Sequence, residues 1–260
     1  MSEIESAVQK SKIELKTKQE INTMKKAGKM AAQVLEELGR FVRSGVTTIE
    51  LDQIAERMVR RLGGIPTFLG YRGYPATICV SINEEVVHGI PSSRKIKTGD
   101  IVSLDFAATV DGFVGDIAKT WVIEPVTNEA RKLVEVTEQC LRLAIEIMKP
   151  GKRLGDIGHA VQAYAQKYGY GVVRDFVGHG IGRQMHEEPA VPNFGKPDTG
   201  IKLEPGLVLA VEPMVTMGGS DVRVLSDGWT VVTRDNSLAA HFEHTIAITE
   251  EGPVVLTNPR

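Results

Sequence analysis

Residues 100–123 read DIVSLDFAATVDGFVGDIAKTWVI, two apolar segments on either side of an Asp111-Gly112 pair. Both segments alternate in the way that strands with one packed face do. An Asp-Gly pair between two such segments favours a two-residue type I′ turn. The stretch therefore predicts a β-hairpin.

The register of this hairpin follows from its turn. If Val110 pairs with Phe113, Asp105 and Asp116 project from the same face as diagonal neighbours. Carboxylates this close repel each other unless a cation or a shared proton compensates. Either the two acids face water on an exposed sheet, or this face of the hairpin binds a metal ion.

The last third of the chain supplies further candidate ligands in apolar surroundings, where a solvated carboxylate is uncommon. His179 lies in the glycine-rich run GHGIG, Glu212 ends an apolar strand before Pro213, and Glu243 lies in the strand-like run HFEHTIAIT. Four carboxylates and one imidazole suit two divalent first-row ions bridged by water, with oxygen-rich ligation that favours Mn, Fe or Co. The predicted ligands are Asp105, Asp116, His179, Glu212 and Glu243.

The remaining histidines differ in context. His159 falls within a predicted helix and His244 on the apolar face of its strand, so both are expected in ordinary structural positions. His241 lies two residues from a proposed ligand and is given no role. His88 and His186, in loops bounded by Gly and Pro, are the candidates for substrate contact.

Several side chains near the glycine-rich segments could be core or could line an apolar pocket. Phe68, Tyr71, Tyr74 and Trp229 belong to this group, and the residues alone do not decide between the two interpretations. Cys79 lies in the apolar run TICVSI, where a packed thiol is commoner than a nucleophile.

A ten-residue pattern occurs twice. Residues 96–105 match residues 203–212 in apolar positions, in the Gly and in the terminal acid, and a His-Gly-Ile precedes each, at His88 and His179. Amphipathic periods predict two helices ahead of each strand-rich part. These helices cover residues 18–42, 47–63, 127–148 and 154–168. We therefore expect two similar halves, each ordered helix, helix, strands.

Composition narrows the class of protein. The 260 residues suffice for one large domain or two fused halves, and a formal charge of -2 gives no general attraction to nucleic acid or to an anionic membrane. The first twenty residues are polar and of mixed charge, without the apolar run of a signal peptide or a membrane span, so a cytoplasmic location is expected. The two cysteines predict no disulfide framework.

Six motifs in order carry a resemblance: NEEVVHGIP, SLDF, DGFVGDIAKTW, GHGIG with MHEEP, AVEPM and HFEHTIAI. From about residue 15 to residue 258 the chain resembles type I methionine aminopeptidases of the bacterial type. The resemblance implies an α+β pita-bread fold, with two pseudo-symmetric halves, a curved antiparallel sheet and helices on its outer face. It also implies a single catalytic domain over residues 15–260 after a short extension, residues 1–14.

The same resemblance assigns roles to the candidate residues. It implies that the five predicted ligands bind two divalent ions (Co, Mn, Fe or Zn), with Asp116 and Glu243 as bridges. His88, His186 and Glu212 would be catalytic. The side chains implied to contact substrate are His88, His186, Phe68, Tyr71, Tyr74, Cys79, Met185 and Trp229.

The activity implied is removal of the initiator methionine from nascent proteins before a small second residue. A hydroxide bridging two metals would attack the first peptide bond while Glu212 moves the proton. The expected partners are the N-termini of nascent polypeptides, with contact to the ribosome, no nucleic-acid substrate, no membrane and a monomeric state. Two alternatives remain: a proline-directed peptidase of the same fold, and a non-enzymatic binding module.

Overall fold

The computed structural model describes residues 13–259. The predicted extension, residues 1–14, therefore lies mostly outside the described residues. Within residues 13–259 no helix combines the length and the apolar composition that crossing a membrane requires.

The predicted hairpin is present. Strands β4 (Ile101–Val110) and β5 (Phe113–Val122) pair antiparallel along their whole length, with Val110 opposite Phe113. Asp111 and Gly112 form the turn with φ of 51° and 75°, the left-handed conformation that a type I′ turn requires and that Gly adopts without strain. The predicted register is confirmed.

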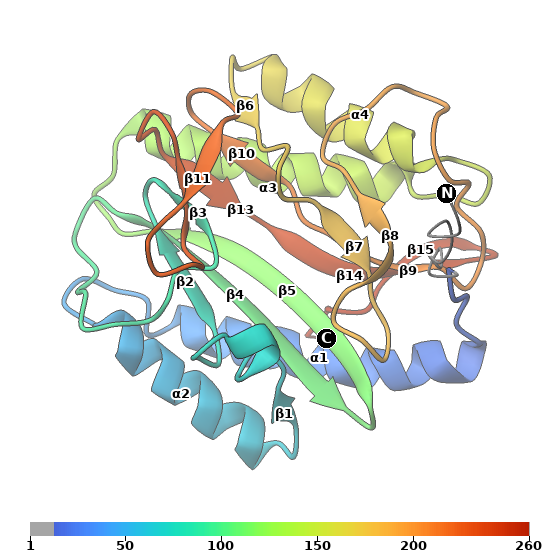
Figure 1. Cartoon of the computed structure of the whole chain (residues 1–260), viewed down its shortest axis with the longest axis horizontal. Helices are drawn as coiled ribbons and strands as arrows, with labels where there is room; N and C mark the ends of the chain where they lie inside the picture. Colours follow the sequence, from blue (N-terminus) through green and yellow to red (C-terminus); the bar gives the residue numbers. More distant parts are fainter. Residues whose placement is uncertain (1–12, 260) are drawn as a thin grey trace, which may run out of the picture.

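The hairpin lies in a nine-stranded sheet whose main path runs β1-β4-β5-β14-β9-β7-β8, with β2 on β4 and β15 on β14 (Figure 1). The antiparallel β5–β14 pair is the seam where the two halves of the chain meet. The bounds of the other strands are β1 (Ile65–Pro66), β2 (Cys79–Ile82), β7 (Gly178–Gly180), β8 (Glu187–Val191), β9 (Val208–Val211), β14 (Glu243–Thr249) and β15 (Gly252–Val255).

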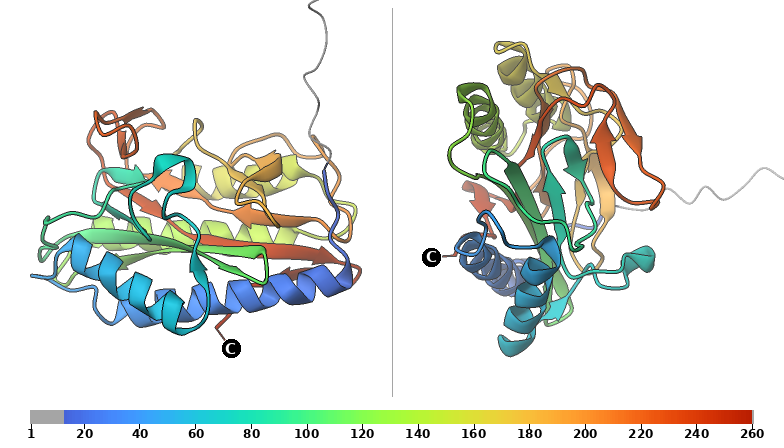
Figure 2. Two further views of the ribbon diagram at one scale, coloured as in Figure 1. Left: turned by 60° about the horizontal axis from the view of Figure 1, so that its bottom comes forward. Right: turned by 90° about the vertical axis from the view of Figure 1, so that its left-hand side faces the viewer.

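Four helices lie along one side of the curved sheet (Figure 2). They are α1 (Lys18–Gly39), α2 (Thr48–Arg61), α3 (Asn128–Ile147) and α4 (Leu154–Gln166). Capping boxes at Thr17 and Thr47 begin the first two, because each threonine accepts a backbone N–H three residues on while the glutamate there reaches back. Helix α1 packs directly on β5: a Cβ on Gly115 would overlap the backbone of Gly28. Each predicted helix is found within a few residues of its expected ends.

Two three-stranded sheets and one 3-10 turn, η1 (Tyr71–Gly73), account for the remaining elements within residues 13–259. One has the order β13-β10-β6 and packs beneath α3, since Val215 and Ala240 belong to the same apolar cluster as the buried face of that helix. The other has the order β11-β12-β3 and lies on the side of the main sheet away from the helices (Figure 2). Their strands are β3 (Glu85–Val87), β6 (Gly171–Val172), β10 (Met214–Thr216), β11 (Val222–Val224), β12 (Val231–Thr233) and β13 (Ala239–His241).

Two of the apolar clusters follow the two halves of the chain. One apolar cluster lies between α1, α2 and the first strands, and a second lies between α3, α4 and the later strands. The predicted repetition of helix, helix and strands is therefore confirmed.

One sequence expectation needs adjustment. Alternation in residues 241–249 predicted a single apolar face, whereas Thr245 and Ala247 are as fully buried as Ile246 and Ile248. Ile246 and Ile248 pack with the buried faces of α3 and α4, whereas Ala247 belongs to the cluster that contains Ile181 and Met185 of the loop after β7. The face that carries Glu243 is therefore also removed from water.

Candidate metal and substrate site

Three carboxylates meet on one face of the main sheet because of strand register. Asp105 on β4 and Glu243 on β14 both lie opposite Ala118 of the intervening strand β5. Asp116 precedes Ala118 by two residues and so projects from the same face. Cys79 of β2 lies opposite Asp105 and extends the row. The converging pair inferred for the hairpin thus gains a third member from the other half of the chain.

The second half adds His179 and Glu212 to the same face. His179 on β7 lies opposite Ala210 of β9, and Glu212 follows Ala210 by two residues. The Nε2 atom of His179 lies 3.5 Å from Oε1 of Glu212 and 3.9 Å from Oδ2 of Asp116. The structure therefore brings all five predicted ligands together, although Asp105 and Glu243 lie 138 residues apart in sequence.

Thr245 fixes the seam between the halves at this point. Its hydroxyl accepts the N–H of Asp116 and donates to the carbonyl of Asp116, both at 2.9 Å. Strand β14 can therefore not slide along β5 without breaking two buried hydrogen bonds. The relative position of Asp116 and Glu243 is thus held by the pairing of β5 with β14 and by the Thr245 hydroxyl.

The cluster carries more negative charge than its surroundings can stabilise. Burial, followed by the neighbouring carboxylates, raises the pKa of Asp105, Glu212 and Glu243 well above the usual range, and burial raises that of Asp116 to about 7. One oxygen each of Asp105, Asp116 and Glu243 has no hydrogen-bond partner among the described residues. Buried carboxylate oxygens of this kind need protons or cations.

A divalent cation fits the arrangement. Ligand atoms of Asp116, His179 and Glu243 all lie within 4.8 Å of one another. His179 places its Nδ1 atom 2.9 Å from the carbonyl oxygen of Gly180, and donation to that carbonyl leaves Nε2 as a lone-pair donor toward the carboxylates. Burial lowers the pKa of His179 to about 3, so the ring is neutral, as metal binding requires.

Of the two histidines predicted to contact substrate, His186 lies beside His179, and His88 packs against Phe176 and Trp229. His186 has its Nδ1 atom 2.8 Å from the hydroxyl of Tyr71, and its ring centre lies 4.2 Å from that of His179. His88 has a positive φ of 61° and packs edge-on against Phe176. Burial lowers the pKa of both histidines to about 4, so each is a neutral hydrogen-bonding group at pH 7.

The apolar side chains predicted to contact substrate form one cluster. Tyr74 packs edge-on against Phe68 and Trp229, and its hydroxyl donates to the carbonyls of Ile78 and Gly89. These side chains lie next to the carboxylates, since Cys79 of the same cluster is opposite Asp105. The cluster includes Phe68, Tyr71, Tyr74, Cys79, Met185 and Trp229.

His241 is the residue that sequence reasoning passed over. It is almost fully buried at the end of β13, and its Nε2 atom lies 3.7 Å from Oε2 of Glu212. Its separation of two residues from Glu243 was the available signal. The other two histidines are placed as expected: His159 is exposed on α4, and His244 bonds Thr257 on the opposite face from Glu243.

Comparison with known proteins gives a consistent picture. Residues 22–250 match the model of metallopeptidase family M24. The chain is 49% identical to methionine aminopeptidase 1 of Bacillus subtilis over 242 residues, covering 93% of this chain and 98% of that protein. It is 47% identical to methionine aminopeptidase of Aquifex aeolicus over 255 residues, covering 94% and 98%.

Solved structures agree on the fold. The crystal structure of methionine aminopeptidase from Thermotoga maritima superposes with a TM-score of 0.93 at 46% identity, covering 95% of this chain and all of that one. The prolidase of Pyrococcus horikoshii superposes with a TM-score of 0.77 at 22% identity and is covered over 64% of its length. The α+β pita-bread fold expected from the motifs is confirmed.

Proposed function

The chain belongs to metallopeptidase family M24, and from this membership together with its site we propose that it removes the initiator methionine from nascent proteins. It is a metal-dependent aminopeptidase, as the sequence predicted. The observation that carries the proposal is the convergence of three carboxylates from β4, β5 and β14 with His179 and Glu212 on one buried face.

Five residues would hold the metal ions, for which the unpartnered carboxylate oxygens and the neutral His179 are suitable ligands. We propose two divalent ions per chain, drawn from Co, Mn, Fe and Zn, with Asp116 and Glu243 as the shared ligands. When bound, such ions supply Lewis-acid activation of water and of the substrate carbonyl. The proposed ligands are Asp105, Asp116, His179, Glu212 and Glu243.

Glu212 is the proposed proton carrier. As a proposed metal ligand, Glu212 would lie within hydrogen-bond reach of the attacking water and keep one carboxylate oxygen free, so it could take a proton during attack on the peptide bond and return it to the departing amine. His88 and His186, neutral at pH 7, would donate hydrogen bonds to the carbonyl oxygen of the scissile bond. The hydroxyl of Tyr71 fixes the ring of His186 for that purpose.

The aromatic and sulfur-containing side chains beside the carboxylates would receive the methionine side chain. A flexible, polarizable thioether packs well against rings and against another methionine, here Met185. We further propose a preference for a small second residue, action on nascent N-termini at the ribosome, a monomeric state and a cytoplasmic location. Residues 15–260 would form one catalytic domain after the extension.

A peptide panel tests the reaction. Purified protein is stripped with chelator, reloaded with Mn, Fe, Co or Zn, and assayed on Met-Ala-Ser, Met-Lys-Ser and an Xaa-Pro peptide. We expect metal-restored release of methionine from Met-Ala-Ser alone. Cleavage of the Xaa-Pro peptide would assign the chain to the proline-directed peptidases, and no cleavage with any metal would support a binding module.

Glu212→Gln tests the proton carrier. The amide keeps the shape of the side chain but cannot take up a proton, so kcat should fall by about a hundredfold, in the range usual for loss of general acid–base catalysis. The melting temperature checks that the variant is folded. Near-normal turnover with bound metal would remove Glu212 from the proton-transfer role.

A further inference from the structure

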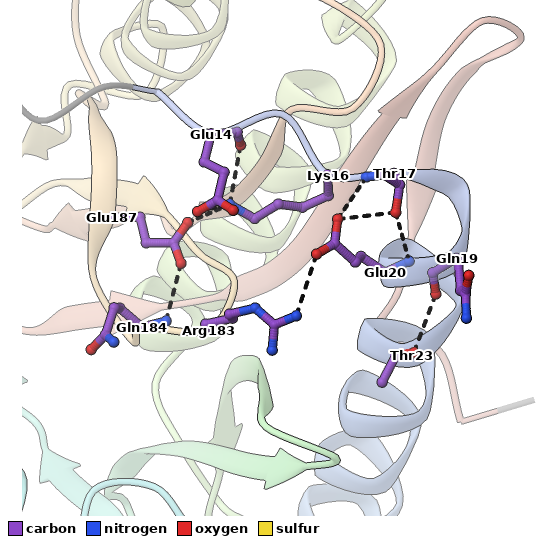
Figure 3. A network of polar contacts seen from close by, with 9 residues as sticks. All are labelled: Glu14, Lys16, Thr17, Gln19, Glu20, Thr23, Arg183, Gln184 and Glu187. Atoms are coloured by element: carbon purple, nitrogen blue, oxygen red, sulfur yellow. Dashed lines mark hydrogen bonds and ion pairs between the residues drawn. The ribbon is translucent and has the colours of Figure 1, made fainter.

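The loop that carries Met185 and His186 is held by the segment ahead of α1. Figure 3 shows the contact: Nζ of Lys16 lies 2.5 Å from Oε2 of Glu187, the first residue of β8. The side chains of Lys16 and Glu187 are 2% and 13% exposed, so the ion pair is largely removed from water. Removing one partner of such a buried pair destabilises the folded structure strongly, because the other charge stays buried without a partner.

Lys16 is itself anchored to the sheet. Its N–H donates to the carbonyl of Gly206 at 2.7 Å, and the N–H of Gly206 donates to the carbonyl of Ile248 in β14. Its ammonium also donates to the carbonyl of Glu14 at 3.0 Å. The cation therefore has a fixed position relative to the strand that bears Glu243.

Glu187 connects Lys16 to the loop. Its second oxygen, Oε1, accepts the N–H of Gln184 at 3.0 Å, closing the loop on itself. The stem of Lys16 packs over Gly182, where an added Cβ would overlap Cε of the lysine. A further ion pair, Arg183 with Glu20 at 3.4 Å, is more exposed and so contributes less (Figure 3).

We propose that Lys16 is a positioning residue, which acts through Glu187 to hold residues 181–187 so that His186 faces the carboxylate cluster. The role rests on the proposed function, because it presumes that His186 contacts the substrate. Without the ammonium, the carboxylate of Glu187 would be left unpaired in a buried site, and the loop would have to open to hydrate it. The ring of His186 would then move away from His179 and Tyr71.

The test compares Lys16→Met with Lys26→Met. Lys26 lies on α1 and pairs with Asp111 at 2.9 Å, but both side chains are more than half exposed and neither forms a hydrogen bond or ion pair with residues 181–187. We expect Lys16→Met to lower kcat for Met-Ala-Ser about tenfold, the scale of a modest misplacement of a reacting group. Lys16→Arg should restore most of the loss, and Lys26→Met should change nothing.

Two further measurements separate positioning from general stability. In a His186→Ala background, Lys16→Met should have little additional effect on kcat, since its action passes through that ring. Amide hydrogen exchange in residues 181–187 should accelerate in Lys16→Met and stay unchanged in Lys26→Met. If Lys16→Met fails to fold, Glu187→Gln provides the same comparison, because its amide oxygen can still accept from Gln184.

The outcomes distinguish this proposal from the function on which it rests. Equal losses in kcat with and without His186, or unchanged exchange in the loop, would overturn the positioning role. A different result would reject the proposed activity alone. In that case exchange in residues 181–187 would be faster in Lys16→Met than in the parent protein, while the parent released no methionine with any metal.

Discussion

The two halves of the sheet supply their ligands in different ways. In the first half, Asp105 and Asp116 lie inside two ten-residue strands joined by a two-residue turn. In the second half, His179 lies on a three-residue strand, Glu212 follows the end of β9, and Glu243 begins β14. The same order of helices and strands therefore holds its acidic side chains within strands in one half and near strand ends in the other.

The ligands of the two halves also differ in what determines their positions. The register of the hairpin is set locally by its turn, so Asp105 and Asp116 would be neighbours in an isolated hairpin of this register. The second-half ligands have no such local constraint. Glu243 is placed by pairing with β5 and by the hydrogen bonds of Thr245 to Asp116, two residues 129 positions apart. The second half is thus positioned by the first.

The largest effect should come from the two acids on either side of the seam. We expect Asp116→Asn and Glu243→Gln each to lower metal-dependent turnover on Met-Ala-Ser by at least about a thousandfold, or some 4 kcal/mol of transition-state stabilisation. Both remove a proposed shared ligand without changing volume. Metal titration with each variant is the independent measurement.

Unequal losses of metal binding in these two variants would show that the two halves do not contribute equally to the metal site. If Glu243→Gln retained tight binding of metal while Asp116→Asn did not, the first half would hold the metal largely alone. Asp100→Asn serves as the control, because Asp100 accepts from Asn83 and Lys97 away from the site and should leave turnover intact.

An intermediate effect is expected at the seam itself. Thr245→Val keeps the shape of the side chain but leaves the N–H and the carbonyl of Asp116 without the hydroxyl, so the free energy of unfolding should fall by about 2 kcal/mol. Urea denaturation measures it. Thr249→Val removes two hydrogen bonds at the far end of β14, one to Gly252 and one from Glu251, and is the matched control. It should cost less because these bonds are nearer to solvent.

The smallest effect is a pH dependence of the metal-free protein. The carboxyl pKa values are raised in the folded state, so their contribution to stability is present below the unfolded value of about 4 and is lost as pH rises through the folded values, about 7 for Asp116. The buried histidines have lowered pKa values, so they make the stability of the folded protein rise with pH up to the unfolded histidine pKa of about 6.5. Above that pH they no longer oppose the effect of the carboxyl groups. Stability in chelator should therefore decline as pH rises above about 6.5.

Asp105→Asn sharpens this prediction. Removing one charge should raise the stability of the metal-free protein at pH 8 by about 1 kcal/mol, the scale of one unit of pKa shift, and flatten its pH dependence. With metal present the order should reverse, since the variant loses a ligand and with it the stabilisation by binding. If Asp105→Asn were less stable than the parent protein in chelator, repulsion among the carboxylates would not be destabilising the metal-free protein.

The sequence by itself determined the elements whose constraints are local. The Asp111-Gly112 turn set the register that puts Asp105 and Asp116 on one face, and the capping boxes at Thr17 and Thr47 marked where helices begin. The motif order then identified the family. These predictions succeed because turn geometry and helix capping act over a few residues.

Only the tertiary structure decided which distant side chains meet. The contact of His241 with Glu212 depends on the pairing of β13 with β10, which places His241 opposite Met214, two residues after Glu212. The pairing of Lys16 with Glu187 joins residues 171 positions apart. Both faces of β14 are buried because helices and later loops cover it from opposite sides, which no alternation within residues 241–249 can report. The physical reason is that contacts across the sheet are set by long-range strand pairing and packing, and neither leaves a period in the local sequence.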